Sequence, residues 1–112
     1  MASYLTPSAE NCVVVHLLDS AQGQPLQSWR FPQQSEITIG RGDDCDIVIV
    51  NQQVSRAHAT LVQQDGKWVL HSTGRHGTIV GDRLVSEFAL QHETVFQLGT
   101  GGPMMRFDAE LR

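Results

Sequence analysis

Three short loops in the middle of the chain each combine an arginine with glycine or a hydroxyl-bearing residue. They span residues 40–44 (Gly-Arg-Gly-Asp-Asp), 54–58 (Val-Ser-Arg-Ala-His) and 74–78 (Gly-Arg-His-Gly-Thr). An arginine side chain presents a planar fork of N–H donors that matches a doubly charged oxyanion such as a phosphate. Glycines allow tight turns and can aim backbone N–H groups at the same anion, and the hydroxyls of Ser55 and Thr78 add short polar groups. The pattern predicts a phosphate-binding surface made of loops.

Composition and charge narrow the classes of function to consider. The chain has 112 residues, enough for one domain, and its 40% hydrophobic and 18% charged residues are typical of soluble globular proteins. The net charge of −4 disfavours non-specific nucleic-acid binding, which requires many backbone phosphates to be neutralised. No apolar run approaches the roughly 20 residues that span a bilayer, and we see no secretory signal. We therefore expect a cytoplasmic protein without a membrane segment.

Short apolar segments separated by turn residues predict the elements that position these loops. About ten segments have the length and the β-branched or alternating character of strands. They are residues 12–18, 26–31, 36–39, 46–50, 58–63, 67–70, 78–80, 83–85, 94–98 and 104–107. Only residues 86–92 have the composition of a helical turn. So many short strands with turns between them indicate an all-β sandwich.

The remaining expectations concern domain limits, aromatic residues and cysteines. We predict a lead-in at residues 1–11, one domain at 12–108 and a tail at 109–112. The two cysteines, Cys12 and Cys45, lack metal-binding or redox spacing and are expected to be reduced thiols. Five aromatic residues are expected in the core. These are Trp29, Trp68, Phe88, Phe96 and Phe107.

The order of the loop motifs resembles the forkhead-associated (FHA) domain. The matching segments are Ile39-Gly40-Arg41, residues 46–49, residues 54–59 and Gly77-Thr78, and the likeness extends from about residue 36 to about residue 107. A glycine–arginine pair alone is a weak signal, but its combination with a later serine–x–x–histidine and glycine–threonine is specific. The resemblance implies a SMAD/FHA-like β-sandwich of about eleven strands, with loops at one end that bind phosphothreonine peptides.

The resemblance also implies a role for each loop residue. Arg41, Ser55 and Arg75 match positions that contact the phosphate. Arg56 and His76 match positions that contact the peptide. The residues that would hold these loops in shape are Gly40, His58, Gly77 and Thr78.

His76 is the main departure from the family pattern, which has an asparagine at this position, and Gly74 replaces a serine. An asparagine offers an acceptor and a two-proton donor in one plane, whereas a neutral imidazole offers one of each on opposite edges. His76 could donate to a peptide carbonyl or, when protonated, to the phosphate. We expect phosphate affinity to survive and peptide affinity or sequence preference to weaken.

The expected function is therefore a non-enzymatic module that binds a phosphothreonine-containing protein or peptide in Ser/Thr-kinase-dependent signalling. No cofactor or metal is expected, because His58, His71 and His76 have no spacing that fixes three metal ligands. A catalytic pair of Ser55 and His58 would lack an orienting carboxylate and an oxyanion hole.

Two alternatives stay open. The first is a scaffold or assembly domain of the same fold with a degenerate, phospho-independent site, which the changes at residues 74 and 76 would favour. The second concerns the arginines, which could form surface ion pairs instead of binding a ligand. The nearest candidate partners of Arg41 are Asp43, Asp44 and Asp46. The partner, its sequence preference and the oligomeric state are not determined by the sequence.

Overall fold

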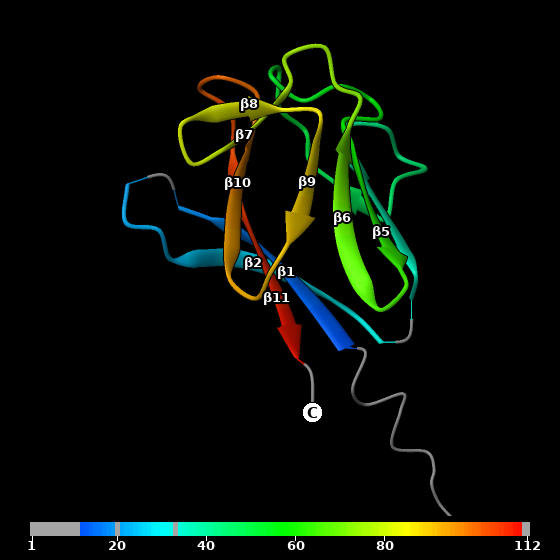
Figure 1. The fold of residues 1–112 in the computed structure, drawn as a ribbon. Coiled ribbons are helices and arrows are strands. Elements are labelled where there is room, and N and C mark those ends of the chain that lie inside the picture. Colours follow the sequence, from blue (N-terminus) through cyan, green and yellow to red (C-terminus); the bar gives the residue numbers. More distant parts are fainter. Residues whose placement is uncertain (1–11, 20, 33, 111–112) are drawn as a thin grey trace, which may run out of the picture.

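The computed structural model describes residues 12–19, 21–32 and 34–110 and shows two β-sheets packed face to face (Figure 1). One sheet has six strands in the order β2-β1-β11-β10-β7-β8, and the other has five in the order β4-β3-β5-β6-β9. The strands are β1 Cys12–Leu18, β2 Pro25–Phe31, β3 Glu36–Gly40, β4 Ile47–Val48, β5 Ala59–Gln64, β6 Lys67–Ser72, β7 Thr78–Val80, β8 Arg83–Val85, β9 Glu87–Leu90, β10 Thr94–Leu98 and β11 Met104–Glu110. The all-β sandwich is confirmed. The predicted lead-in, residues 1–11, lies outside the described residues.

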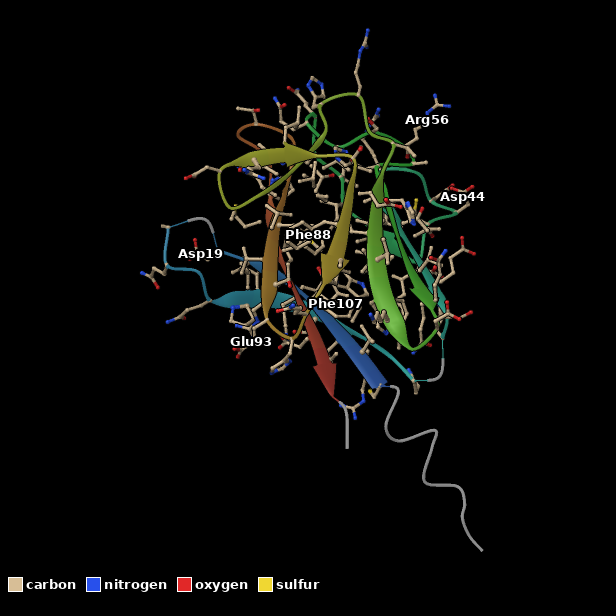
Figure 2. All side chains as sticks on the ribbon, in the orientation of Figure 1. Asp19, Asp44, Arg56, Phe88, Glu93 and Phe107 are labelled. Atoms are coloured by element: carbon tan, nitrogen blue, oxygen red, sulfur yellow. The ribbon has the colours of Figure 1, made fainter. Side chains whose placement is uncertain are left out.

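Alternation along the strands builds the core between the sheets. Ile37, Leu61, Leu70 and Phe96 are fully buried, because every second side chain of a strand points to the same face. Among the five aromatic residues, Trp68, Phe96 and Phe107 are buried, and Trp29 and Phe88 pack against the core with partial exposure. Figure 2 shows Phe88 and Phe107 in the interior of the sandwich.

β9 corrects one expectation, because residues 86–92 contain a strand and not a helical turn. Its register places Phe88 opposite Leu70 and Leu90 opposite Trp68 on β6. Alternate apolar side chains can therefore reach the core. The pairing with β6 outweighs the local helical composition of this short segment.

Other differences are small. β4 is shorter than predicted, since only Ile47 and Val48 pair with β3, and Val50 is 85% exposed. β11 continues beyond the predicted end at Phe107 to Glu110. Both cysteines are free, as expected.

Within the described ranges, no helix is long and apolar enough to cross a membrane. The same residues contain no group of three or more histidine, cysteine or acidic side chains that could hold a metal ion.

Candidate functional site

The three loops that the sequence singled out lie at one end of the sandwich, the upper end in Figure 1. We call residues 40–44 the first loop, 54–58 the second and 74–78 the third. Ser55 of the second loop joins the other two. Its carbonyl accepts a 2.8 Å hydrogen bond from the backbone N–H of Arg41, and its hydroxyl oxygen accepts one of 2.9 Å from the backbone N–H of Arg75. Residues far apart in the chain therefore meet around this serine.

Arg41 is exposed and partly fixed. Its Nε donates a 3.0 Å hydrogen bond to the carbonyl of Val54, and no other described residue bonds the guanidinium, so both terminal NH2 groups are available. None of the ion pairs in the described part of the chain involves Arg41. The carboxylate of Asp46, one candidate partner, instead accepts hydrogen bonds from the N–H and the hydroxyl of Thr38, at 2.9 and 3.1 Å. The guanidinium can therefore bind an external anion without breaking an ion pair.

His58 holds the second and third loops together from inside. The ring is fully buried; its Nδ1 accepts a 3.1 Å hydrogen bond from the Ser55 N–H, and its Nε2 lies 2.7 Å from the carbonyl of Gly77. Because a backbone N–H can only donate and a carbonyl can only accept, the ring carries its proton on Nε2 and is neutral.

The surroundings of His58 favour this neutral form. Burial lowers the pKa of His58, the hydrogen bond to Gly77 opposes this effect, and nearby His76 lowers the pKa further. The net shift is downward, so the ring stays neutral at physiological pH.

Two glycines allow the loops to approach closely. A Cβ atom at Gly40 would lie 2.0 Å from the carbonyl oxygen of Arg56, and one at Gly74 would lie 2.6 Å from the ring of His58. A serine at position 74, as the FHA resemblance would place there, has no room unless the third loop moves. The glycine at this position therefore follows from the contact with His58.

Thr78 and Gly77 support the third loop. Thr78 is fully buried, and its hydroxyl lies 2.8 Å from that of Ser72. Gly77 has a φ of +74°, a conformation that favours glycine, and Leu84 packs closely against it.

The exposed side chains of the three loops line two separate hollows. One, of about 480 Å³, is lined by Arg41, Arg56 and their neighbours in the first two loops, including Asp43 and Asp44. Figure 2 shows Arg56 and Asp44 on this flank.

The other hollow, of about 410 Å³, is lined by the third loop, with Arg75 and His76, and by residues 84–86. Thus Arg41 and Arg75 do not share one hollow, although both are hydrogen-bonded to Ser55.

A fourth loop, residues 99–103, also belongs to this end, which the sequence did not reveal. Gly99 has a φ of +87°, and a Cβ atom on it would lie 3.0 Å both from the carbonyl oxygen of Gln53 and from Cβ of His76. The buried Gly102 also lies close to Gln53. The signal was the cluster of glycines, which marks close backbone approach as well as flexibility.

The two-sheet topology and the four converging loops define a β-sandwich of the FHA class. The FHA domain family matches residues 37–99, more than half of the chain, and the chain belongs to this family. A comparison with curated proteins gives no match.

Solved structures with this fold come from organisms as different as a bacterium and a plant. The crystal structure of FHA-1 of Mycobacterium tuberculosis Rv1747 is 22% identical, covers 89% of this chain and 97% of its own, and has a TM-score of 0.74. The solution structure of an FHA domain of an Arabidopsis thaliana hypothetical protein is 16% identical and has a TM-score of 0.78. The alignment covers 97% of this chain and 94% of the Arabidopsis domain. Mycobacterium tuberculosis EmbR, in complex with a low-affinity phosphopeptide, is 25% identical, covers 88% of this chain and 25% of its own, and has a TM-score of 0.69.

Proposed function

We propose that the loop end binds phosphothreonine in a protein or peptide partner and acts in Ser/Thr-kinase-dependent signalling in the cytoplasm. The observation that carries this proposal is the pair of hydrogen bonds that join Arg41 and Arg75 to Ser55. Family membership and the phosphopeptide complex of the similar EmbR support it.

The phosphate would be bound by Arg41, Ser55 and Arg75. Arg41 offers two terminal NH2 groups. The oxygen of the Ser55 hydroxyl accepts from the Arg75 N–H, so the hydroxyl proton stays available for a phosphate oxygen. Charge-assisted hydrogen bonds contribute about 1.5–3 kcal/mol each. After the cost of association, a few of them give micromolar affinity, on the order of −8 kcal/mol.

The peptide would be contacted by Arg56 and His76. Both side chains are exposed; Arg56 lines the hollow of the first two loops, and His76 lines that of the third. Arg75 and His76 are the two central residues of a turn closed by a 3.1 Å hydrogen bond from the Gly77 N–H to the Gly74 carbonyl. This turn fixes the backbone of the third loop and leaves both side chains directed to solvent.

A binding role is favoured over a catalytic one by the contacts of His58. Its Nδ1 accepts from the backbone N–H of Ser55 and not from the hydroxyl, and its Nε2 bonds Gly77. Among the described residues, the Ser55 hydroxyl therefore has no hydrogen bond to a base that could remove its proton.

Titration with matched peptides tests the proposal. A phosphothreonine peptide library screened on the purified chain supplies a binding sequence, and calorimetry then compares the phosphorylated peptide with its plain counterpart. We expect binding of the phosphorylated peptide alone. Equal weak binding of both would instead support the second candidate, a phospho-independent assembly domain, which the histidine at position 76 favours.

A further inference from the structure

One of the two hollows described above has an apolar wall. The hollow of about 410 Å³ is lined on one side by the third loop and on the other by Leu84 and Val85 of β8. Figure 1 shows β8 at the same end of the sandwich as the three loops. Leu84 is 69% exposed, and of the large hydrophobic residues exposed in the described part of the chain, it alone lines either hollow. Its side chain is therefore available to a ligand that docks on the loops.

Two glycines of the third loop leave this hollow open. Gly74 and Gly77 both line it, and neither places a side chain in it. A Cβ atom at Gly74 would lie 2.6 Å from the ring of His58, so a side chain at this position requires the loop to move. Gly77 has a φ of +74°, and Leu84 packs against it. The space beside Leu84 therefore follows from the contacts that shape the third loop.

The hollow lies next to the site proposed for the phosphate. Arg75 lines the hollow, and its backbone N–H donates the 2.9 Å hydrogen bond to the Ser55 hydroxyl. Arg75 is two residues from Gly77, which contacts Leu84, so the path from the Ser55 hydroxyl to Leu84 is on the order of 10–15 Å. An extended peptide advances about 3.3 Å per residue. A peptide side chain within about four positions of a phosphothreonine at Ser55 can therefore reach Leu84.

The charges around the hollow disfavour an ionised peptide side chain. Arg75 and His76 lie on its rim, and none of the residues that line it is acidic. A basic peptide side chain would meet the like charge of Arg75, and an acidic one would compete with the phosphate for the same guanidinium. An apolar side chain avoids both effects and can pack against Leu84 and Val85.

We propose that this hollow binds an apolar side chain of the phosphothreonine partner, of about the size of leucine, and that Leu84 determines this preference. The inference rests on the proposed function, because the bound phosphate places the peptide beside the hollow. Contact with Leu84 and Val85 removes apolar surface of both molecules from water, which adds affinity without a further charge. The phosphate then reports that the partner is phosphorylated, and the hollow selects among phosphorylated partners.

Peptides that differ at one position test the preference. The background is the phosphothreonine peptide found by the library screen. Each residue within four positions of its phosphothreonine is replaced in turn by leucine, alanine or glutamate, and calorimetry measures the affinity of each peptide with and without the phosphate. At one of these positions, leucine should bind on the order of 10-fold more tightly than alanine, the gain expected from partial burial of the larger side chain.

Variants of the protein assign this preference to Leu84. Leu84→Ser should reduce the ratio of the two affinities to about 2-fold or less, whereas Leu84→Met keeps an apolar side chain and should retain most of it. The matched control is Leu26→Ser, since Leu26 is 66% exposed on β2, the opposite edge of the same sheet, and this variant should keep the full ratio. Thermal unfolding checks the fold of each variant. A ratio of affinities within one variant also cancels any general effect of the substitution on the third loop.

The outcomes separate this inference from the proposed function. Phosphate-dependent binding with equal affinity for leucine and alanine at every position would overturn the inference and leave phosphothreonine binding intact. An undiminished preference in Leu84→Ser would overturn the role of Leu84, and a preference for glutamate would assign the hollow to Arg75 and His76. A failure of every phosphorylated peptide to bind would overturn the proposed function and this inference together.

Discussion

The protein contains two clusters of arginine, histidine, serine and aspartate, and they are arranged in opposite ways. On the outer face of the six-stranded sheet, Arg106 forms two 3.0 Å hydrogen bonds with Asp108, and Nε2 of His16 lies 3.0 Å from the same carboxylate. Burial alone would raise the pKa of Asp108, but its hydrogen bonds and charge interactions with Arg106 and His16 lower it overall. At the loop end, no ion pair of the described residues involves Arg41, Arg56 or Arg75.

The difference shows how one set of side-chain types can serve stability in one place and recognition in another. In the sheet cluster, the charges satisfy one another, so their removal should affect folding and not binding. At the loop end, backbone groups and the neutral His58 hold the loops in place, so the guanidinium groups contribute little to the fold. Each prediction below assigns an effect to one of the two regions.

The largest effect is expected for Arg41→Ala. In the proposed complex the guanidinium donates charge-assisted hydrogen bonds to the phosphate, so its loss should weaken phosphopeptide binding at least about 100-fold. The free energy of unfolding should change by no more than about 1 kcal/mol, because only the hydrogen bond from Nε to the Val54 carbonyl is lost. Calorimetry and urea denaturation measure the two quantities. Arg83→Ala, an exposed arginine outside the loops, is the control, and unchanged affinity in Arg41→Ala would refute the role of Arg41.

Asp108→Asn should give the opposite result. It leaves Arg106 and His16 without their carboxylate and should lower the free energy of unfolding by about 2 kcal/mol, with phosphopeptide affinity unchanged. The pKa of Asp108 is lowered in the fold, so its contribution is present above the unfolded value of about 3.9 and lost as the pH falls through the folded value. Acid denaturation of both proteins tests this, and a loss of affinity in the variant would show that the regions are coupled.

Because of His58, we expect the stability of the fold to decline in mild acid. Its pKa is lowered in the fold, so the unfolded chain takes up a proton first as the pH falls below about 6.5, and stability declines from there toward the folded value. Protonation of Nδ1 would also break the hydrogen bond from the Ser55 N–H. Urea denaturation at a series of pH values should show this decline in the wild type. His58→Gln should be less stable overall and lack that part of the pH dependence; an identical slope would assign the decline to other groups.

The smallest effect is expected at His76. His76→Asn should strengthen phosphopeptide binding a few-fold, because an asparagine offers an acceptor and a two-proton donor in one plane and can clamp the peptide backbone. Calorimetry of the wild type and the variant measures the two affinities. Equal affinity in both would eliminate a role of this side chain in peptide binding.

Most of the fold could be predicted because its signals are local. Alternating apolar residues marked ten of the eleven strands, and the order of the glycine, arginine, serine and histidine motifs pointed to the loop end. β9 was missed because residues 86–92 carry helix-forming side chains, and only the pairing with β6 makes the segment a strand. No local pattern reports on such a pairing.

The contacts within the site were less accessible to sequence reasoning. The hydrogen bond from the Arg75 N–H to the Ser55 hydroxyl joins residues 20 positions apart, and its partners depend on how the loops pack. The close approach of Gly74 to His58, and of Gly99 to Gln53 and His76, likewise depends on how the loops pack. Residue types indicated which loops matter, whereas the way in which the loops support one another required coordinates.

The hydrogen bonds that join the loops around Ser55 have a consequence for kinetics. Because the loops are already bound to one another, a partner can dock with little rearrangement of the backbone, as in other preorganised complexes. Different partner sequences should then associate at similar rates, and their affinities should differ mainly in how long each complex lasts.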